Sequence, residues 1–187
     1  MKRIAFDIDG CVINLQDPLN YYFKKMYNIS LPPEAFSRAT IEEAVNMSYE
    51  KVLVCVNECV ADIYRQNFYP GSVDFIKKYH VYSEREVLFV TNRWDQVNTY
   101  KLLDRYFDDI PYHVSFIKGS KVEELKKQKV DIFVEDRVEN AEEISNEGIL
   151  TFLIERPWNQ TEIKDSGNLI RVKDWFELEE VYKKMEE

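Results

Sequence analysis

Histidine and cysteine are scarce in this sequence, and their scarcity excludes several common types of active site. Only two of the 187 residues are histidines and only three are cysteines. His80 and His113 have no cysteine or serine motif nearby, which argues against a histidine-rich metal site and against a Ser-His-Asp triad. Cys11, Cys55 and Cys59 are too few and too unevenly placed for a disulfide framework. We therefore expect a protein of the reducing cytoplasm.

Glycine and long apolar runs are also in short supply. The sequence has five glycines, and even Gly148 and Gly167, the closest two, are 19 positions apart. Neither a dinucleotide-binding GxGxxG motif nor a P-loop can be written with that spacing. The beginning, MKRIAFDIDG, has no signal-peptide pattern, and no apolar run approaches the roughly 20 residues of a membrane span. We expect no membrane partner.

The charge balance is acidic, with 25 Lys and Arg against 34 Asp and Glu and a net charge of −9. An acidic chain repels a polyphosphate backbone, so we expect no binding of long nucleic acids. Small anionic substrates are compatible with this charge, because a pocket can be locally positive. With 45% hydrophobic residues, the composition is that of a soluble globular protein. The length of 187 residues predicts one main domain. A monomer or a homodimer is expected.

Short apolar segments alternate with helical patterns along most of the chain. The apolar segments are rich in Val, Ile and Phe, as is typical of parallel strands buried on both faces. The segments between them have the length of crossover helices. This alternation predicts an α/β fold, a three-layer sandwich around a parallel sheet. The expected strands are 3–7, 86–91, 113–117, 131–135, 149–154 and an edge strand at 169–172, and the expected helices are 95–106, 121–128, 138–147 and 175–185.

A stretch of about 54 residues interrupts this alternation. Residues 17–27 have a helical pattern, and Thr40-Ile-Glu-Glu43 is a capping box that marks a helix start. Residues 49–67 carry apolar side chains at a spacing of three to four, which predicts an amphipathic helix of about five turns. The predicted division is therefore a core of residues 1–15 and 70–187, with a helical cap of residues 16–69 inserted after the first strand.

Polar residues follow several of the predicted strands directly. In open α/β sheets, ligands bind beyond the carboxyl ends of the strands, so these residues are the candidates for chemistry. We expect carboxylates, a hydroxyl and a lysine to converge on one edge of the sheet. The segments are Asp7-Ile-Asp9-Gly10 after the first strand, Thr91-Asn92-Arg93 after the second, Glu135-Asp136-Arg137 after the fourth, and Lys121 at the start of the helix between the third and fourth strands.

Crowded carboxylates repel one another, and a hard cation such as Mg²⁺ is the usual means of keeping them ionised. Asp7 would then be free to attack phosphorus and form an aspartyl-phosphate. Asp9 lies two residues further on, where it could protonate the leaving oxygen and later deprotonate water. Thr91 and Lys121 would hold the phosphoryl oxygens. Either Lys118 or Lys121 could supply this cation, and we favour Lys121 because the capping box Ser120-Lys-Val-Glu123 predicts a helix that begins there.

The segments DIDGCV, FVTNR, Lys121 and VEDR, in this order, resemble the four motifs of the haloacid dehalogenase (HAD) superfamily of phosphotransferases. The helical insertion after the first motif is similar to the C1 cap of that superfamily. The resemblance covers residues 3–10 and 87–148, most of the predicted core. Residues 110–144 are similar to the 5'(3')-deoxyribonucleotidases and the bacterial nucleotidases related to them.

The resemblance implies a role for each matching residue. Asp7 corresponds to the nucleophile, and Asp9 to the acid/base residue whose backbone carbonyl also binds the metal. Cys11 stands where threonine is usual, so we expect modest tuning from the lost hydroxyl. The implied set is Asp7, Asp9, Thr91 and Lys121 for catalysis, Thr91, Asn92, Arg93 and Lys121 for phosphate binding, and Asp7, Asp9 and Asp136 for Mg²⁺.

The function that these observations favour is a Mg²⁺-dependent phosphomonoesterase of the nucleotidase type, acting on a small phosphorylated substrate. A HAD phosphatase for sugar phosphates or nucleic-acid 3'-phosphates is an alternative, and so is a metal- and phosphate-binding module without turnover. A dehalogenase is disfavoured, because it uses one aspartate and no metal and would leave Asp9 unexplained. Arg93 and Arg137 also have a structural interpretation, as salt-bridge partners. Glu135 could equally be a solvated group or one that only supports the residues around it.

Overall fold

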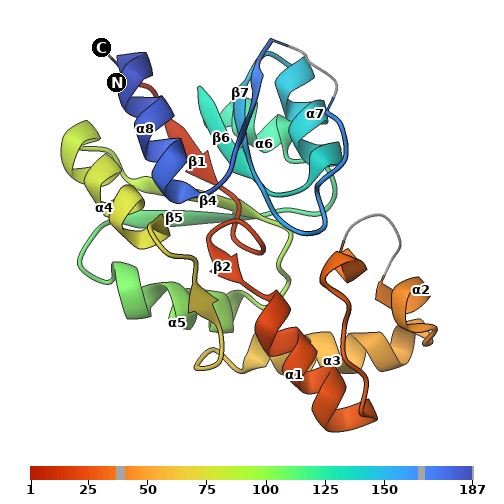
Figure 1. Ribbon diagram of the computed structural model, residues 1–187. Helices are drawn as coiled ribbons and strands as arrows, with labels where there is room; N and C mark the ends of the chain where they lie inside the picture. Colours follow the sequence, from red (N-terminus) through yellow and green to blue (C-terminus); the bar gives the residue numbers. More distant parts are fainter. Residues whose placement is uncertain (37–40, 164–166, 187) are drawn as a thin grey trace.

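A parallel sheet of six strands lies at the centre of the described residues, 1–36, 41–163 and 167–186, of this computed structural model (Figure 1). The strand order is β5-β4-β1-β6-β7-β8. The predicted parallel sheet is therefore confirmed, including the edge strand at its end. The strands are β1 (Ile4–Phe6), β4 (Val87–Thr91), β5 (Tyr112–Phe116), β6 (Ile132–Glu135), β7 (Leu150–Ile154) and β8 (Leu169–Val172).

Helices cover both faces of this sheet, which makes the three-layer sandwich that the sequence predicts. Successive side chains of a strand point to opposite faces. Phe6 accordingly packs in one apolar cluster with Phe75 and Trp175, whereas its neighbour Ala5 packs in a second cluster with Leu125 and Ile144. The first face carries α4 (Ser72–Ser83), α5 (Gln96–Phe107) and α8 (Trp175–Glu186), and the second carries α6 (Val122–Lys127) and α7 (Val138–Asn146).

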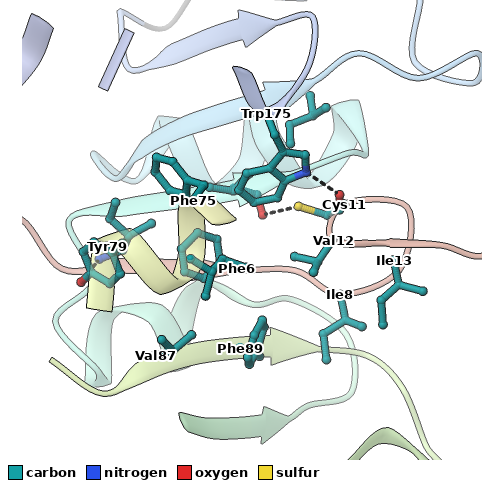
Figure 2. Close-up of a cluster of buried hydrophobic side chains, with 14 of the residues drawn as sticks. Phe6, Ile8, Cys11, Val12, Ile13, Phe75, Tyr79, Val87, Phe89 and Trp175 are labelled. Carbon is teal, nitrogen blue, oxygen red and sulfur yellow. Dashed lines mark hydrogen bonds between the residues drawn. The ribbon is translucent and has the colours of Figure 1, made fainter. Parts of the chain in front are cut away.

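The larger cluster supports the loop that follows β1 (Figure 2). The indole Nε1 of Trp175 donates to the carbonyl oxygen of Cys11 at 3.1 Å, and the Cys11 thiol donates to the carbonyl oxygen of Val134 at 3.4 Å. Ile8 and Val12 of the same loop are fully buried. Burying one large apolar side chain stabilises a fold by about 1.5–3 kcal/mol. The loop is therefore fixed by core packing as well as by hydrogen bonds.

Helix α4 is not among the elements expected from the sequence. It follows Gly71, whose φ of +84° is the left-handed conformation that glycine adopts without strain. Phe75, Ile76 and Tyr79 are buried on one side of the helix. Their spacing of one, three and four positions is the ordinary signal of an amphipathic helix and is present in the sequence.

The inserted residues form helices that have an apolar cluster of their own. Leu19, Phe23, Cys55 and Cys59 belong to this cluster. A two-stranded antiparallel ribbon, β2 (Ile13–Asn14) and β3 (Asn67–Phe68), joins the insertion to the rest of the chain (Figure 1). Thr40, the first residue of the predicted capping box, lies outside the described residues, and helix α2 begins at the next residue, Ile41. The helical elements are α1 (Gln16–Tyr27), the 3-10 helix η1 (Pro33–Phe36), α2 (Ile41–Val45) and α3 (Tyr49–Ala61).

Helix α3 is shorter than the sequence predicts, since it ends at Ala61 rather than near Asn67. The buried Gln66 side chain folds back and donates from Nε2 to the carbonyl oxygens of Cys59 and Val60, at 2.9 and 3.0 Å. Tyr64, which fits the helical spacing in the sequence, is 80% exposed. A tertiary contact of Gln66 therefore replaces the last predicted turns.

Along the described part of the chain, no helix combines the length and the apolar character that crossing a membrane requires.

Candidate functional site

The candidate site lies where β1, β4 and β6 end. Since β4 and β6 flank β1 in the sheet, the residues after these three strands are brought together. Asp7, Glu135 and Asp136 each present a carboxylate oxygen, and these oxygens lie within 4.8 Å of one another. All three residues are buried. The strand-end argument thus places together two of the three predicted metal ligands, with Glu135 beside them.

Lys121 joins this cluster from the beginning of α6. Its Nζ lies 2.9 Å from Asp7 Oδ1 and 2.8 Å from Glu135 Oε2. Burial alone would lower the pKa of Lys121, but the charges of Asp7 and Glu135 raise it above its ordinary value, so the lysine stays charged. Lys118, by contrast, is exposed.

The helix begins one residue later than the capping box predicts. Lys121 itself occupies the N-cap position of α6, with Val122 as the first helical residue. The Ser120 hydroxyl accepts a hydrogen bond from the backbone N–H of Val122 at 3.2 Å. Lys121 is therefore held at the turn before the helix, where its side chain reaches the end of the sheet.

The carboxylates of the cluster are not equivalent. Burial raises the pKa of Asp7 to about 7, opposed by Lys121 and reinforced by Glu135. Burial, together with the charges of Glu135 and Asp7, raises the pKa of Asp136 well above its usual range. For Glu135 burial is outweighed by Lys121 and by the N–H of Asp136, which lower its pKa. A cation bound here would favour the ionised forms of Asp7 and Asp136.

Glu135 is saturated with protein donors. Its Oε1 accepts from the backbone N–H groups of Asp136 and Arg137 at 3.0 and 3.2 Å. Its Oε2 accepts from Lys121 and from Asn140 Nδ2 at 2.8 and 3.2 Å. Glu135 therefore holds the loop after β6 and orients Lys121. The side chain of Arg137 is exposed and takes no part in these bonds.

Asp136 has one oxygen held and one free. Its Oδ2 accepts from Trp158 Nε1 at 2.7 Å, and its backbone carbonyl accepts from Asn159 Nδ2 at 2.7 Å. Its Oδ1 is buried and has no hydrogen-bond partner among the described residues. A buried carboxylate oxygen without a donor is a costly arrangement that a bound cation would relieve. The oxygen-only donor set of this cluster fits Mg²⁺.

Gly10 permits the close approach of the first loop to Asp136. Its φ is +75°, and a Cβ atom added there would lie only 2.2 Å from Asp136 Oδ2. Any larger residue would push the carboxylate away. The glycine of the DIDG segment is therefore required by packing against Asp136 as well as by its backbone conformation.

Asp9 points to a different partner from Asp7. Arg93 Nε donates to both of its carboxylate oxygens at 2.8 and 2.9 Å, and Arg93 Nη2 donates to Oδ1 at 2.6 Å.

The hydroxyl of Thr91, which is buried, accepts from the backbone N–H of Arg93 at 3.2 Å. Asn92 Nδ2 donates to the carbonyl oxygen of Gly119 at 3.0 Å and so joins the loop after β4 to the loop before α6.

Several residues that organise this region are not among those predicted from the sequence. Arg156 donates from Nε to the carbonyl oxygen of Gly10 at 2.6 Å and from Nη2 to that of Cys11 at 3.1 Å. The residues after β7, RPWN, therefore support both the first loop and Asp136. Their signal is present in the sequence, because a polar and aromatic segment follows a buried strand there too. The missed residues are Gln66, Asn140, Arg156, Trp158 and Asn159.

Comparisons with known proteins agree with this geometry. No family model matches the sequence. The chain is 31% identical over 186 residues to "Putative nucleotidase YqfW" of Bacillus subtilis, covering 95% of this chain and 91% of the relative. It is 27% identical over 197 residues to a nucleotidase of Clostridium acetobutylicum, covering 94% and 91%.

Solved structures show the same fold at low sequence identity. One is a putative phosphoglycolate phosphatase from Lactobacillus plantarum, with a TM-score of 0.66, 15% identity, and 97% of this chain and 100% of that chain covered. Another is a HAD family hydrolase from Deinococcus radiodurans with bound phosphate and sodium, with a TM-score of 0.67, 10% identity, and coverage of 98% and 96%. The identity to the Bacillus protein shows the family, and the fold and the four sequence segments of the site agree with it. The chain therefore belongs to the nucleotidase group of the haloacid dehalogenase superfamily.

Proposed function

We propose that the protein is a Mg²⁺-dependent phosphomonoesterase that acts through an aspartyl-phosphate and hydrolyses nucleoside monophosphates. The observation that carries this proposal is the buried cluster of Asp7, Glu135 and Asp136 with Lys121 against it. Such a site presents a nucleophile, metal ligands and a fixed cation to one small anion. The nucleotidase names of the relatives support the choice of substrate.

Asp7, Asp136 and the backbone carbonyl of Asp9 are the residues that we propose to hold Mg²⁺. The free oxygen of Asp136, buried and without a donor in the described part of the chain, supports this assignment. Mg²⁺ would neutralise charge on the phosphoryl oxygens and keep Asp7 and Asp136 ionised. Trp158 and Gly10 fix the position of Asp136 from two sides.

Asp7 is the proposed nucleophile. A carboxylate oxygen of Asp7 forms a bond to phosphorus while the bond from phosphorus to the ester oxygen breaks. Asp9 gives its proton to the departing oxygen, which leaves as the alcohol. A water molecule then attacks the aspartyl-phosphate, Asp9 takes the proton of that water, and inorganic phosphate leaves with Asp7 restored.

Thr91, Asn92 and Lys121 are the proposed groups around the transferring phosphoryl oxygens. Lys121 carries a fixed positive charge within the site, where it stabilises negative charge without reorganisation. The sequence also assigns Arg93 to phosphate binding. Since the structure directs Nε and Nη2 of Arg93 to protein groups, we propose that it contributes through Asp9.

We also propose that residues 16–69 act as a cap over a core of residues 1–15 and 70–187. The separate apolar cluster of the insertion and the ribbon of β2 and β3 support this division. A location in the cytoplasm, and a monomeric or dimeric state, remain predictions from the sequence.

The test is a panel of nucleoside monophosphates and sugar phosphates with p-nitrophenyl phosphate as a general substrate, with and without EDTA. We expect Mg²⁺-dependent release of phosphate, fastest from nucleotides. A preference for sugar phosphates would move the protein to the alternative substrate class. Binding of Mg²⁺ and phosphate without release from any ester would identify a binding module instead.

A further inference from the structure

Two buried side chains connect the proposed acid/base residue to the last turn of helix α3. Arg93 binds the carboxylate of Asp9 through Nε and Nη2, at 2.6–2.9 Å. The same Nη2 donates to Gln66 Oε1 at 2.6 Å. Gln66 Nε2 in turn donates to the carbonyl oxygens of Cys59 and Val60 at 2.9 and 3.0 Å. Asp9 is thereby linked to the inserted helices through side chains from three separate segments.

The burial of these groups shows which of them is fixed. The side chain of Arg93 is 1% exposed, whereas that of Asp9 is 31% exposed. A guanidinium that donates from two of its nitrogens to one carboxylate restricts both the position and the plane of that carboxylate. Arg93 therefore holds Asp9 from the interior of the protein, while the side chain of Asp9 stays partly exposed.

The hydrogen bonds of Gln66 determine which end of its amide faces Arg93. Its two bonds to α3 carbonyls require the amide nitrogen, so the amide oxygen is left for Arg93. Gln66 is fully buried and directly precedes β3, one of the two strands that join the insertion to the core. A displacement of the end of α3 would therefore be transmitted to Arg93.

We propose that Arg93 and Gln66 are positioning residues for Asp9, which set the orientation of its carboxylate and make its proton transfer depend on the position of helix α3. This inference rests on the proposed phosphatase function. Arg93 acts here through Asp9 because Nε and Nη2 are engaged by protein groups, whereas Nη1 is buried and has no hydrogen-bond partner among the described residues. Two of its three guanidinium nitrogens are therefore unavailable to a substrate.

The test compares two substrates that differ in their need for a proton. The alcohol of a nucleoside 5'-monophosphate leaves only with a proton from Asp9, whereas p-nitrophenolate leaves readily without one. The ratio kcat/KM covers the steps up to formation of the aspartyl-phosphate. For Arg93→Met and Gln66→Met, we expect kcat/KM for the nucleotide to fall at least about 30-fold. This is part of the roughly 10²–10⁴-fold that general acid–base catalysis usually contributes. We expect a loss below about threefold for p-nitrophenyl phosphate.

Arg65→Met is the matched control, since it deletes the same charge from another Arg–Asp pair, in the turn just before Gln66. Arg65 pairs with Asp62 at 3.3 Å, and its side chain is 43% exposed. We expect neither substrate to be affected by this change. Binding of inorganic phosphate with Mg²⁺, measured as a shift in Tm, should be the same in Arg93→Met as in the wild type. Equal losses on both substrates, or weaker phosphate binding, would make Arg93 a phosphate ligand and overturn the inference.

A double-variant measurement covers the case in which Arg93→Met does not fold. In an Asp9→Asn background, Gln66→Met should no longer change the ratio of the two kcat/KM values, because the residue through which it acts is gone. An unchanged effect of Gln66→Met in that background would overturn the inference. If the wild type hydrolysed neither substrate, the proposed function would fail as well, whereas wild-type turnover with equal losses would overturn only the role of Arg93 and Gln66.

Discussion

Lys121 Nζ lies 2.9 Å from Asp7 Oδ1, and both side chains are almost entirely buried. An ion pair in such a place interacts more strongly than one in water, but both partners have lost their hydration. The arrangement therefore depends on the further acceptor that Glu135 provides for the lysine, at 2.8 Å. It also places the charged Nζ of Lys121 beside the carboxylate of Asp7, the proposed nucleophile.

Replacement of Asp7 by asparagine should abolish turnover and leave the fold intact. Asparagine has nearly the same shape as aspartate but cannot form the phosphoryl ester. We expect hydrolysis of p-nitrophenyl phosphate to fall to background, with circular dichroism unchanged. Asp109→Asn makes the same change in a solvent-exposed pair with Lys77 and should have no effect. Retention of more than about a tenth of the wild-type kcat, only ~1.4 kcal/mol of barrier, would be incompatible with a nucleophile.

The two lysines near α6 should differ sharply in their importance. Lys121→Met removes a cation from developing negative charge, and we expect kcat/KM to fall about 100-fold, ~3 kcal/mol. It also leaves buried carboxylates without their cation, which should lower the free energy of unfolding by about 3–5 kcal/mol. Lys118→Met deletes the same charge from an exposed side chain, so a loss below about threefold is expected. If Lys118→Met were the more damaging change, the assignment of Lys121 would be wrong.

The sheet could be predicted because its strands carry a strong local signal. Segments such as Val87–Thr91 and Leu150–Ile154 are continuous apolar runs, and both match the expected strands within one residue. Strands β2 and β3, with two residues each, have no such run and exist only because they pair across the insertion. The end of α3 was missed for a related reason, since contacts of Gln66 with the rest of the fold override the local helical pattern.

Magnesium should stabilise the wild-type protein, and Asp136 should be needed for this effect. A ligand present at 100 times its Kd stabilises the folded state by about 2.7 kcal/mol. We expect Mg²⁺ to raise Tm in the wild type and to do so much less in Asp136→Asn. Glu147→Gln, in an exposed pair with Lys126, is the control and should respond like the wild type. Equal shifts in Asp136→Asn and the wild type would place the metal elsewhere.

The candidate site was partly predictable, because several of its residues directly follow buried strands. Asp7, Thr91 and Asp136 follow buried strands, so their convergence comes from the geometry of any parallel sheet. The partners that orient them could not be paired from the sequence. Arg93 meets Asp9, and Trp158 meets Asp136, through the conformations of loops, for which the sequence has no comparable periodic signal.

Trp158 should tune the metal site through its hydrogen bond to Asp136. Trp158→Phe keeps an aromatic ring but removes the Nε1 donor that lies 2.7 Å from Asp136 Oδ2. Groups that orient a metal ligand typically change metal affinity or activity by about 10–100-fold when removed. We expect at least a tenfold weaker dependence of activity and of Tm on Mg²⁺. Trp94→Phe changes an indole that is 57% exposed and should leave Mg²⁺ binding unchanged. An unaltered Mg²⁺ titration of Trp158→Phe would show that this hydrogen bond does not orient the ligand.

Alanine at Gly10 should disturb the metal site as well as the backbone. Alanine at Gly148 is the control, because it carries the backbone cost alone. Gly10 and Gly148 both have positive φ angles, of +75° and +85°, so alanine at either position carries a backbone cost of about 1–2 kcal/mol. At Gly148 an added Cβ meets nothing within 4 Å, whereas at Gly10 it would lie 2.2 Å from Asp136 Oδ2 and 3.0 Å from Trp158. Gly148→Ala should therefore lower Tm but leave kcat and Mg²⁺ affinity unchanged. Gly10→Ala should lower Tm further and also weaken the stabilisation by Mg²⁺, because Asp136 must move to make room. If both variants lost stability equally and bound Mg²⁺ like the wild type, the close approach of Gly10 to Asp136 would have no part in holding the metal ligand.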